Sequence, residues 1–177
     1  MTTQILLAGF GGQGILFAGK FLAYKGLLEG KQLSWLPSYG PEMCGGTANC
    51  SVILSDEPVG SPIVSNPDVL VAMNLPSLDK YEDAVVPGGI IIVDSTLIER
   101  KVERTDVKVF YVPATKMAQE MDAPTLANMI ITGKLMKECR MRTDDIEDSL
   151  KKVVSAKRAN LLEVNLKAIN AGMEYKD

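Results

Sequence analysis

Hydrophobic positions along the chain follow two different patterns. Short apolar runs bounded by turn residues predict strands at residues 4–8, 32–36, 47–55, 68–73, 90–93 and 107–112. Between them, apolar residues recur at steps of three and four, which predicts helices at residues 12–28, 77–84 and 114–121. After residue 124 the helical spacing continues almost to the last residue. This order of elements predicts an α/β domain with a helical C-terminal third.

The predicted strands differ in how polar their two faces are. Residues 47–55 alternate, with Ala48, Cys50, Val52 and Leu54 on one face and polar side chains on most of the other. Residues 90–93 are apolar on both faces, as in a sheet that helices cover on both sides. We therefore expect a three-layer, Rossmann-like domain over residues 1–177. Its sheet should be mostly parallel, with a mixed sheet as the alternative.

Local signals refine the predicted helices and loops. Small residues within 12–28 should let that helix lie close to the sheet. Pro124 suits the first turn of a helix, and Thr143 is a candidate N-cap with two aspartates behind it. Residues 37–46 are rich in glycine and proline, which predicts a long loop after the second strand.

Composition and charge exclude several classes of protein. The net charge of −3 gives no electrostatic reason to expect nucleic acid, and no apolar run approaches the roughly 20 residues of a membrane span. The odd cysteine count and the lack of an evident signal peptide favour a cytoplasmic location. The sequence contains no histidine, which excludes a Ser-His-Asp triad, a Cys-His dyad and zinc bound by imidazole.

The cysteines do not indicate a metal centre or a nucleophile. There is no C-x-x-C pair, so we expect no iron–sulfur cluster held by this chain alone and assign no metal ligand. Cys50 alternates with apolar residues and should be buried. Cys44 lies in the glycine-rich segment, where no histidine is available to activate it. Cys139 receives no role, and no residue is assigned a catalytic one.

The first candidate binding motif is GFGGQG at residues 9–14, between the first strand and the first helix. In this context glycines let the backbone approach a phosphate, and the N–H groups at the helix start attract the anion. We therefore select Gly9, Gly11, Gly12, Gln13 and Gly14 as binding residues. An acidic residue for the ribose of NAD is missing at residues 32–36, which disfavours a dinucleotide. A tight strand-to-helix turn without a ligand is the structural alternative.

The second candidate segment, residues 37–47, follows a strand and should lie beside the glycine motif at the same edge of the sheet. Ser38, Tyr39 and Thr47 offer hydroxyl groups to a ligand there. The alternative is a rigid turn that packs Tyr39 and Trp35 against a neighbour. Asp94, at the end of another strand, either faces a ligand or caps a following helix.

Three segments together resemble the gamma subunit of 2-oxoacid:ferredoxin oxidoreductases. They are GFGGQG at residues 9–14, SWLPSYGPEMCGGTANC at 34–50 and PDVLVAMN at 67–74, and the likeness extends to residues 113–115 and 127–129. One departure stands out, because Cys44 occupies a position where the family usually has arginine. If that arginine pairs with a phosphate or a partner subunit, this chain lacks the contact.

The resemblance implies a subunit of an enzyme that converts a 2-oxoacid and coenzyme A into acyl-CoA, carbon dioxide and reduced ferredoxin. It places thiamine diphosphate, Mg and 4Fe-4S clusters on alpha, beta or delta partner subunits, with coenzyme A as the ligand expected near this chain. A subunit of an indolepyruvate oxidoreductase and a free-standing nucleotide-binding protein are the alternatives. Self-association of the isolated chain as a homodimer stays open, since an isolated subunit often exposes an apolar face.

Overall fold

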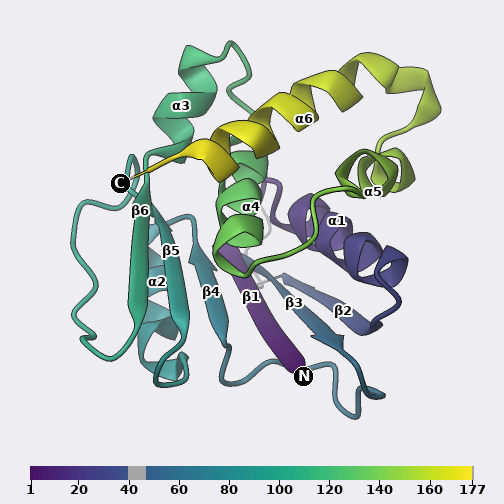
Figure 1. Ribbon diagram of the computed structural model, residues 1–177. Coiled ribbons are helices and arrows are strands. Elements are labelled where there is room, and N and C mark those ends of the chain that lie inside the picture. The colour runs from purple at the N-terminus through teal and green to yellow at the C-terminus, as the bar shows by residue number, and fades with distance from the viewer. Residues whose placement is uncertain (40–46, 177) are drawn as a thin grey trace.

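The computed structural model describes residues 1–39 and 47–176, and in this part six strands form one sheet with helices on both faces (Figure 1). The strands are β1 (Thr2–Phe10), β2 (Gln32–Tyr39), β3 (Thr47–Ser55), β4 (Val69–Ala72), β5 (Ile90–Asp94) and β6 (Lys108–Val112). The helices are α1 (Ile15–Leu28), α2 (Leu75–Tyr81), α3 (Ala114–Glu120), α4 (Ala127–Glu138), α5 (Ile146–Val153) and α6 (Ala159–Glu174), with two short 3-10 helices, η1 (Glu82–Ala84) and η2 (Ala156–Arg158). All six predicted strands and the helical C-terminal third are confirmed.

The sheet is mixed, with the strand order β2-β3-β1-β4-β5-β6. Strands β1, β4, β5 and β6 are parallel to one another, whereas β3 runs antiparallel to both β1 and β2. The connection between β2 and β3 is too short for the crossover of a dozen or more residues that parallel pairing needs. The antiparallel part of the sheet is therefore a consequence of loop length.

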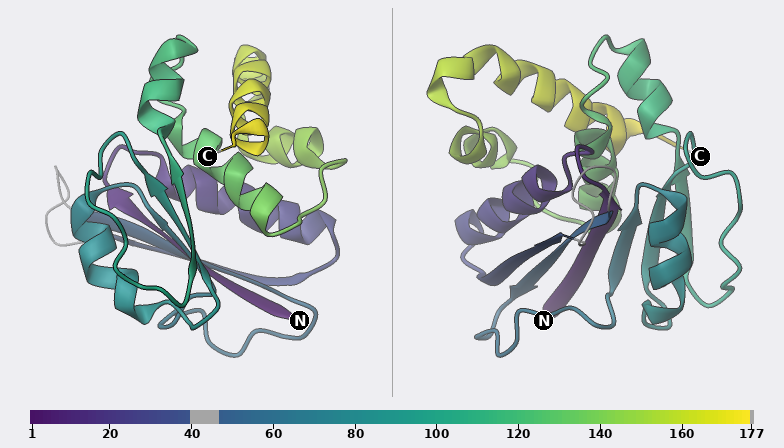
Figure 2. Two further views of the ribbon diagram at one scale, coloured as in Figure 1. Left: turned by 60° about the vertical axis from the view of Figure 1, so that its left-hand side comes forward. Right: turned by 180° about the vertical axis from the view of Figure 1, so that it is seen from behind.

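Three layers are visible when the sheet is viewed on edge, because α2 lies on one face and α1, α4 and α6 lie over the other (Figure 2). The larger core, beneath α1 and α4, includes Phe21, Val52 and Met129. The smaller core includes Leu70 and Leu78 on the side of α2. The predicted alternation of residues 47–55 is confirmed, since Cys50, Val52 and Leu54 belong to the larger core and Ile53 to the smaller one.

Glycines let α1 approach the sheet closely, as the sequence predicts. A Cβ atom at Gly19 would collide with the Sγ of Cys50, and one at Gly26 would collide with the side chain of Leu54. Because the two positions are seven residues apart, they lie on the same side of the helix. The missing side chains therefore set the spacing between α1 and β3.

The predicted loop starts too early, because β2 continues through Pro37 and Ser38 to Tyr39. These residues pair with Cys50, Asn49 and Ala48 of β3. Since β2 is at the edge of the sheet, it tolerates a proline that an internal strand would exclude. The rest of the predicted loop, including Cys44, lies outside the described residues.

Predicted helix starts are also wrong. Helix α1 begins at Ile15 instead of residue 12, and α2 begins at Leu75 instead of residue 77. The fourth helix begins at Ala127, three residues after Pro124, and α5 begins at Ile146 with Asp145 as its N-cap residue, which leaves Thr143 outside the helix. The carboxylate of Asp145 instead forms a 2.7 Å ion pair with the buried ammonium group of Lys25 on α1. A tertiary contact thus lies at the start of α5, and local propensity does not reveal it.

Candidate functional site

The predicted glycine loop connects the end of β1 to the start of α1. Gly12 and Gly14 have φ angles of +91° and +76°, in the left-handed region that glycine adopts without strain. A Cβ atom at Gly12 would meet nothing within 4 Å, so the backbone there borders open space. Gly9 and Gly11 precede this turn, and Gly11, like Gly12, is exposed. The loop therefore has a conformation and an exposure that suit close approach of a ligand.

The side chain of Gln13 holds the loop in place. Its Oε1 accepts a 2.6 Å hydrogen bond from the backbone N–H of Phe10, and its Nε2 donates to the carbonyl of Met73 at 3.0 Å. The backbone N–H of Gln13 also donates to the carbonyl of Phe10, at 3.2 Å. Gln13, one of the predicted binding residues, thus attaches the loop to the carboxyl end of β4. Both polar groups of its side chain already form hydrogen bonds within the protein.

Other backbone donors of the loop remain free. The N–H groups of Gly12, Gly14 and Ile15 have no acceptor in the part of the chain that the structure describes. They lie at the N-terminus of α1, a helix of 14 residues, where the aligned peptide dipoles produce a positive potential. Free N–H groups and this potential together favour a bound anion.

On its other side the loop is attached to α4. The side-chain Nδ2 of Asn128 donates a 3.0 Å hydrogen bond to the carbonyl of Gly14. A Cβ atom at Gly14 would collide with this same amide, so glycine is required there for packing as well as for its φ angle. Asn128 is 4% exposed, and its Oδ1 has no hydrogen-bond partner among the described residues.

The second predicted segment does lie beside the glycine loop. Thr47 pairs with Phe10 across the β1–β3 ladder, and Tyr39 pairs with Ala48, which in turn pairs with Gly9. Ser38 is one step further into the sheet, opposite Asn49. The antiparallel β2–β3 hairpin thus brings Tyr39 and Thr47, the described ends of this segment, to the same sheet edge as the glycine loop, as the sequence predicts.

The register divides the predicted residues between the two faces of the sheet. Cys50 and Val52 face α1, so the alternation of β3 places Thr47 and Asn49 on the opposite face, and Ser38 follows its partner Asn49. The glycine loop, by contrast, leads into α1. The candidate site therefore lies at the edge of the sheet, with hydroxyl groups of Ser38 and Thr47 on one side and backbone amides on the other.

Asp94 belongs to the fold, because its carboxylate is fully buried and engaged. It accepts hydrogen bonds from the hydroxyl of Thr115 at 2.6 Å, from the N–H of Thr96 at 3.1 Å and from the N–H of Thr115 at 3.4 Å. These bonds fix the N-terminus of α3 to the end of β5. Of the two predicted roles, helix capping is the one that the contacts support.

Burial makes the described cysteines poor nucleophiles. It raises the pKa of Cys50 to about 12, against a small opposing effect of a hydrogen bond with Trp35, and it raises the pKa of Cys139 to about 11.

Within the described residues, no group of three or more Cys, Asp or Glu side chains could hold a metal ion. No described helix is long and apolar enough to cross a membrane.

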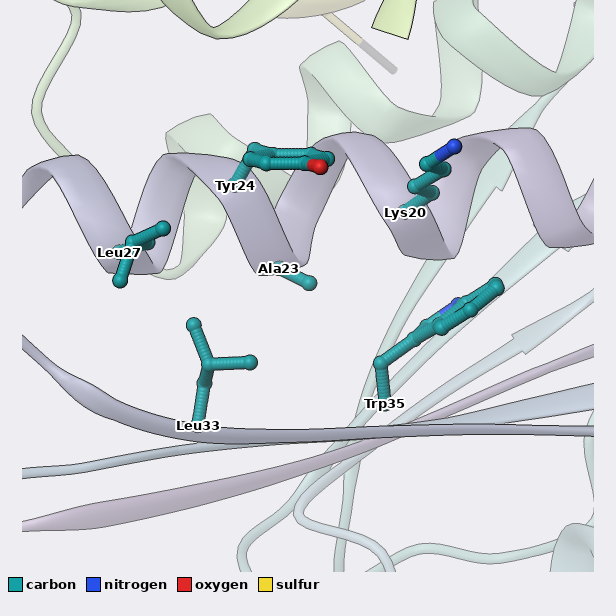
Figure 3. A pocket seen from close by; sticks show the side chains of 6 residues that line it. All are labelled: Lys20, Ala23, Tyr24, Leu27, Leu33 and Trp35. Carbon is teal, nitrogen blue, oxygen red and sulfur yellow. The ribbon is translucent and has the colours of Figure 1, made fainter. Parts of the chain in front are cut away.

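A separate apolar groove of about 280 Å³ lies between α1 and the edge strand β2. Figure 3 shows Ala23 and Leu27 of α1 facing Leu33 and Trp35 of β2, with Lys20 and Tyr24 also at the rim. Leu27 is 55% exposed and Trp35 is 36% exposed. The sequence predicts Trp35 in the strand at residues 32–36 and, in the alternative without a ligand, packs it against a neighbour. It does not reveal the groove, because the approach of α1 to β2 is a tertiary contact.

Two buried asparagines at the glycine loop, Asn74 and Asn128, were not selected from the sequence as site residues. Asn74 follows Met73 at the end of β4, and its Oδ1 accepts a 2.9 Å hydrogen bond from the N–H of Ser77. The spacing of Asn74 and Ser77 is a helix-capping signal, which could have located the start of α2. No local pattern marks the contact between Asn128 and Gly14, which are 114 residues apart.

Comparisons with known proteins place this arrangement in a family. Residues 4–175 match the family model described as pyruvate ferredoxin/flavodoxin oxidoreductase. The VorA subunit of ketoisovalerate oxidoreductase from Methanothermobacter thermautotrophicus is 40% identical over 97% of this chain. The match covers 36% of VorA, so the chain spans about a third of the length of that relative.

Solved structures share the fold over nearly the whole chain. The gamma subunit of a keto/oxoacid ferredoxin oxidoreductase from Geobacter sulfurreducens superposes with a TM-score of 0.82 at 27% identity, covering 97% of this chain and 96% of that one. A 2-oxoglutarate:ferredoxin oxidoreductase from Magnetococcus marinus, with 2-oxoglutarate, coenzyme A and succinyl-CoA bound, gives a TM-score of 0.88 at 25% identity. That match covers 97% of this chain and 30% of the other. The chain therefore belongs to the pyruvate ferredoxin/flavodoxin oxidoreductase family.

Proposed function

We propose that this chain is the gamma subunit of a 2-oxoacid:ferredoxin oxidoreductase, and that residues 1–177 act in it as one domain. The complex would convert a 2-oxoacid and coenzyme A into acyl-CoA, carbon dioxide and reduced ferredoxin in the cytoplasm. Alpha, beta and delta partner subunits would carry thiamine diphosphate, Mg and the 4Fe-4S clusters. The proposal is supported by similarity to a gamma subunit over nearly the whole chain and by a sequence without histidine.

Within this complex, the glycine loop would bind the phosphates of coenzyme A. The observation that carries this proposal is the exposed turn at Gly12, with open space above it and free N–H groups at the start of α1. The structural neighbour from Magnetococcus marinus contains coenzyme A, which makes this ligand the first to test. Ser38 and Thr47, at the same edge of the sheet, would contact other polar groups of the ligand.

The loop offers a matched pair of variants for this test. Gly12→Asp would place a carboxylate at the proposed phosphate site, whereas Gly30→Asp would place one at the opposite end of α1. Both glycines have a positive φ angle, +91° and +77°, and open space around the Cβ position, so the two variants carry similar strain and the same added charge. Calorimetry on the purified complex should show at least about a tenfold loss of coenzyme A affinity for Gly12→Asp, since a charge-assisted hydrogen bond is worth about 1.5–3 kcal/mol.

Gly30→Asp should leave the affinity for coenzyme A unchanged. Equal affinity of both variants and the original complex would contradict coenzyme A binding at the glycine loop. Binding of NAD by the isolated chain would instead support the free-standing nucleotide-binding alternative.

The groove between α1 and β2 supports a second role, which is contact with partner subunits. Trp35 and Leu27 expose apolar surface on an edge strand and an adjacent helix, and such surface is typical of an interface. Trp35→Ser and Leu27→Asp should reduce co-purification of the other subunits. Ile63→Asp is the control, because Ile63 is 62% exposed in the segment between β3 and β4, outside the groove.

Coenzyme A affinity per assembled complex separates the two roles. If the groove serves assembly alone, complexes that still form with Trp35→Ser should bind coenzyme A normally. Normal assembly with both groove variants would contradict an interface at this position. Sedimentation of the isolated chain, with and without Leu27→Asp, would show whether the same surface forms a homodimer.

The acid that the complex oxidises is best identified by direct assay. The relatives act on different substrates, ketoisovalerate in one and 2-oxoglutarate in another. The purified complex should therefore be assayed for reduction of ferredoxin with both acids, with pyruvate and with indolepyruvate. A preference for indolepyruvate would support the alternative subunit assignment.

A further inference from the structure

The neighbouring parallel strands β1 and β4 send their connections to opposite faces of the sheet. After β1 the chain enters α1, whose Phe21 and Leu22 belong to the larger core, and after β4 it enters α2, whose Leu78 belongs to the smaller one (Figure 2). The carboxyl ends of two such strands border a crevice, and open α/β sheets bind ligands at this position. The glycine loop follows the carboxyl end of β1, and Asn74 lies just after the carboxyl end of β4.

Asn74 stands at the β4 side of this crevice. The residue before it, Met73, accepts the hydrogen bond from Gln13, and a Cβ atom at Gly9 would lie 3.2 Å from the Cβ of Met73. The end of β4 and the glycine loop are therefore in direct contact. Asn74 is 2% exposed, and its orientation is fixed because its Oδ1 caps α2 by accepting from Ser77.

The other polar atom of this side chain has no partner. Nδ2 of Asn74 is buried and makes no hydrogen bond among the described residues. A buried donor without an acceptor destabilises the folded state, so native proteins contain few of them. Serine at position 74 would also cap α2, without leaving a buried amide unpaired.

We propose that Asn74 is a ligand-binding residue, whose Nδ2 donates a hydrogen bond to a phosphoryl oxygen of the ligand held by the glycine loop. The proposal rests on the proposed binding of coenzyme A at this loop. The N–H groups of Gly12, Gly14 and Ile15, in the loop and at the start of α1, have no acceptor among the described residues. Asn74 adds a fourth donor from the end of β4, and four such donors suit an acceptor-rich group such as a diphosphate.

Two substitutions remove the Nδ2 donor of Asn74 but keep an oxygen that can cap α2. Asn74→Asp keeps an oxygen for the N–H of Ser77 and replaces the Nδ2 donor by a carboxylate oxygen that repels phosphate. Asn74→Ser keeps a capping hydroxyl and removes the amide, without adding a buried charge that could prevent folding. Affinity for coenzyme A, measured by calorimetry on the purified complex, should fall at least about tenfold in each. The melting temperature of Asn74→Ser should stay within a few degrees of the original.

Pantetheine lacks the diphosphate, so its affinity distinguishes a direct contact of Asn74 with phosphate from an effect through the fold. Its affinity should be unchanged in both variants, and Asn66→Asp should leave both affinities unchanged. Asn66 is an exposed asparagine that precedes β4 and binds the carbonyl of Ala84, so this control adds the same charge away from the crevice.

Three results would overturn the proposal. Equal losses for coenzyme A and pantetheine would mean that Asn74 acts through the fold. Unchanged coenzyme A affinity in both Asn74 variants, with the expected loss in Gly12→Asp, would remove Asn74 from the site and leave the proposed function intact. Unchanged affinity in Gly12→Asp itself would refute coenzyme A binding at the loop, and the role of Asn74 with it.

Discussion

The side-chain amide of Asn128 on α4 donates a 3.0 Å hydrogen bond to the carbonyl of Gly14, the residue that precedes α1. Gln13, the adjacent residue, fixes the same loop to Met73 at the end of β4. The glycine loop is thus held from both sides by side-chain amides before any ligand arrives. Such preorganisation lowers the entropy that binding must otherwise overcome.

Substitution of Asn128 should therefore affect stability in a way that depends on charge. Asn128→Asp would place a buried carboxylate against the carbonyl of Gly14, which should lower the free energy of unfolding by about 2 kcal/mol or more. Asn128→Ala should cost less, because it removes the unpartnered Oδ1 together with the donor. Urea unfolding followed by circular dichroism measures both. Equal losses in the two variants would contradict the described contact.

The packing of α6 on α4 depends on two glycines. A Cβ atom at Gly133 would overlap the backbone of Ile169, and one at Gly172 would overlap the backbone of Ile130. Each alanine substitution should destabilise the protein by at least about 2 kcal/mol, because backbone must move to relieve the overlap. Limited proteolysis should then cut α6 faster than in the original protein.

Gly60→Ala is the control for this prediction. Gly60 has open space around its Cβ position and no positive φ angle, so alanine there should change stability by less than about 1 kcal/mol. Protection of α6 in Gly133→Ala equal to that in Gly60→Ala would show that the two helices do not pack as described.

Lys25 and Asp145 form an ion pair that attaches α5 to α1. The ammonium group is fully buried, and it also pairs with Glu29 at 3.2 Å. Lys25→Met should lower the free energy of unfolding by about 3 kcal/mol, because the variant leaves the Asp145 carboxylate without its partner. The double variant with Asp145→Leu should be less destabilised than Lys25→Met alone. Strict additivity in this double-mutant cycle would argue against coupling between the two residues.

The thiol of Cys50 should react with iodoacetamide far more slowly in the folded protein than in urea at pH 8. Burial raises its pKa from 9.0 to about 12, so almost no thiolate exists at this pH. The unfolded chain loses this proton near its ordinary pKa while the folded chain retains it. The free energy of unfolding should therefore fall as the pH rises from about 9 to about 12. Mass spectrometry locates the modified cysteine, and rapid labelling of Cys50 in the native protein would contradict its burial.

The amino-acid sequence by itself determined the order and type of the elements. Apolar runs identified the six strands of the described residues, and the alternation of residues 47–55 assigned Cys50, Val52, Ile53 and Leu54 to the correct faces, because these signals depend on local periodicity alone. The same local chemistry identified the glycine loop at residues 9–14, since only glycine readily adopts the conformation observed at Gly12 and Gly14. The motifs also indicated the family, which the comparisons confirm.

Only the tertiary structure decided which polar groups are engaged and which remain free. Gln13 is hydrogen-bonded to Phe10 and Met73, Asp94 binds the start of α3, and Asp145 at the start of α5 pairs with Lys25. Apart from the bond between Gln13 and Phe10, these contacts join segments far apart in the chain, so local periodicity does not reveal them. The unpaired amide of Asn74 becomes evident only when the end of β4 lies against the glycine loop, because a missing partner can be recognised only after all neighbours are in place.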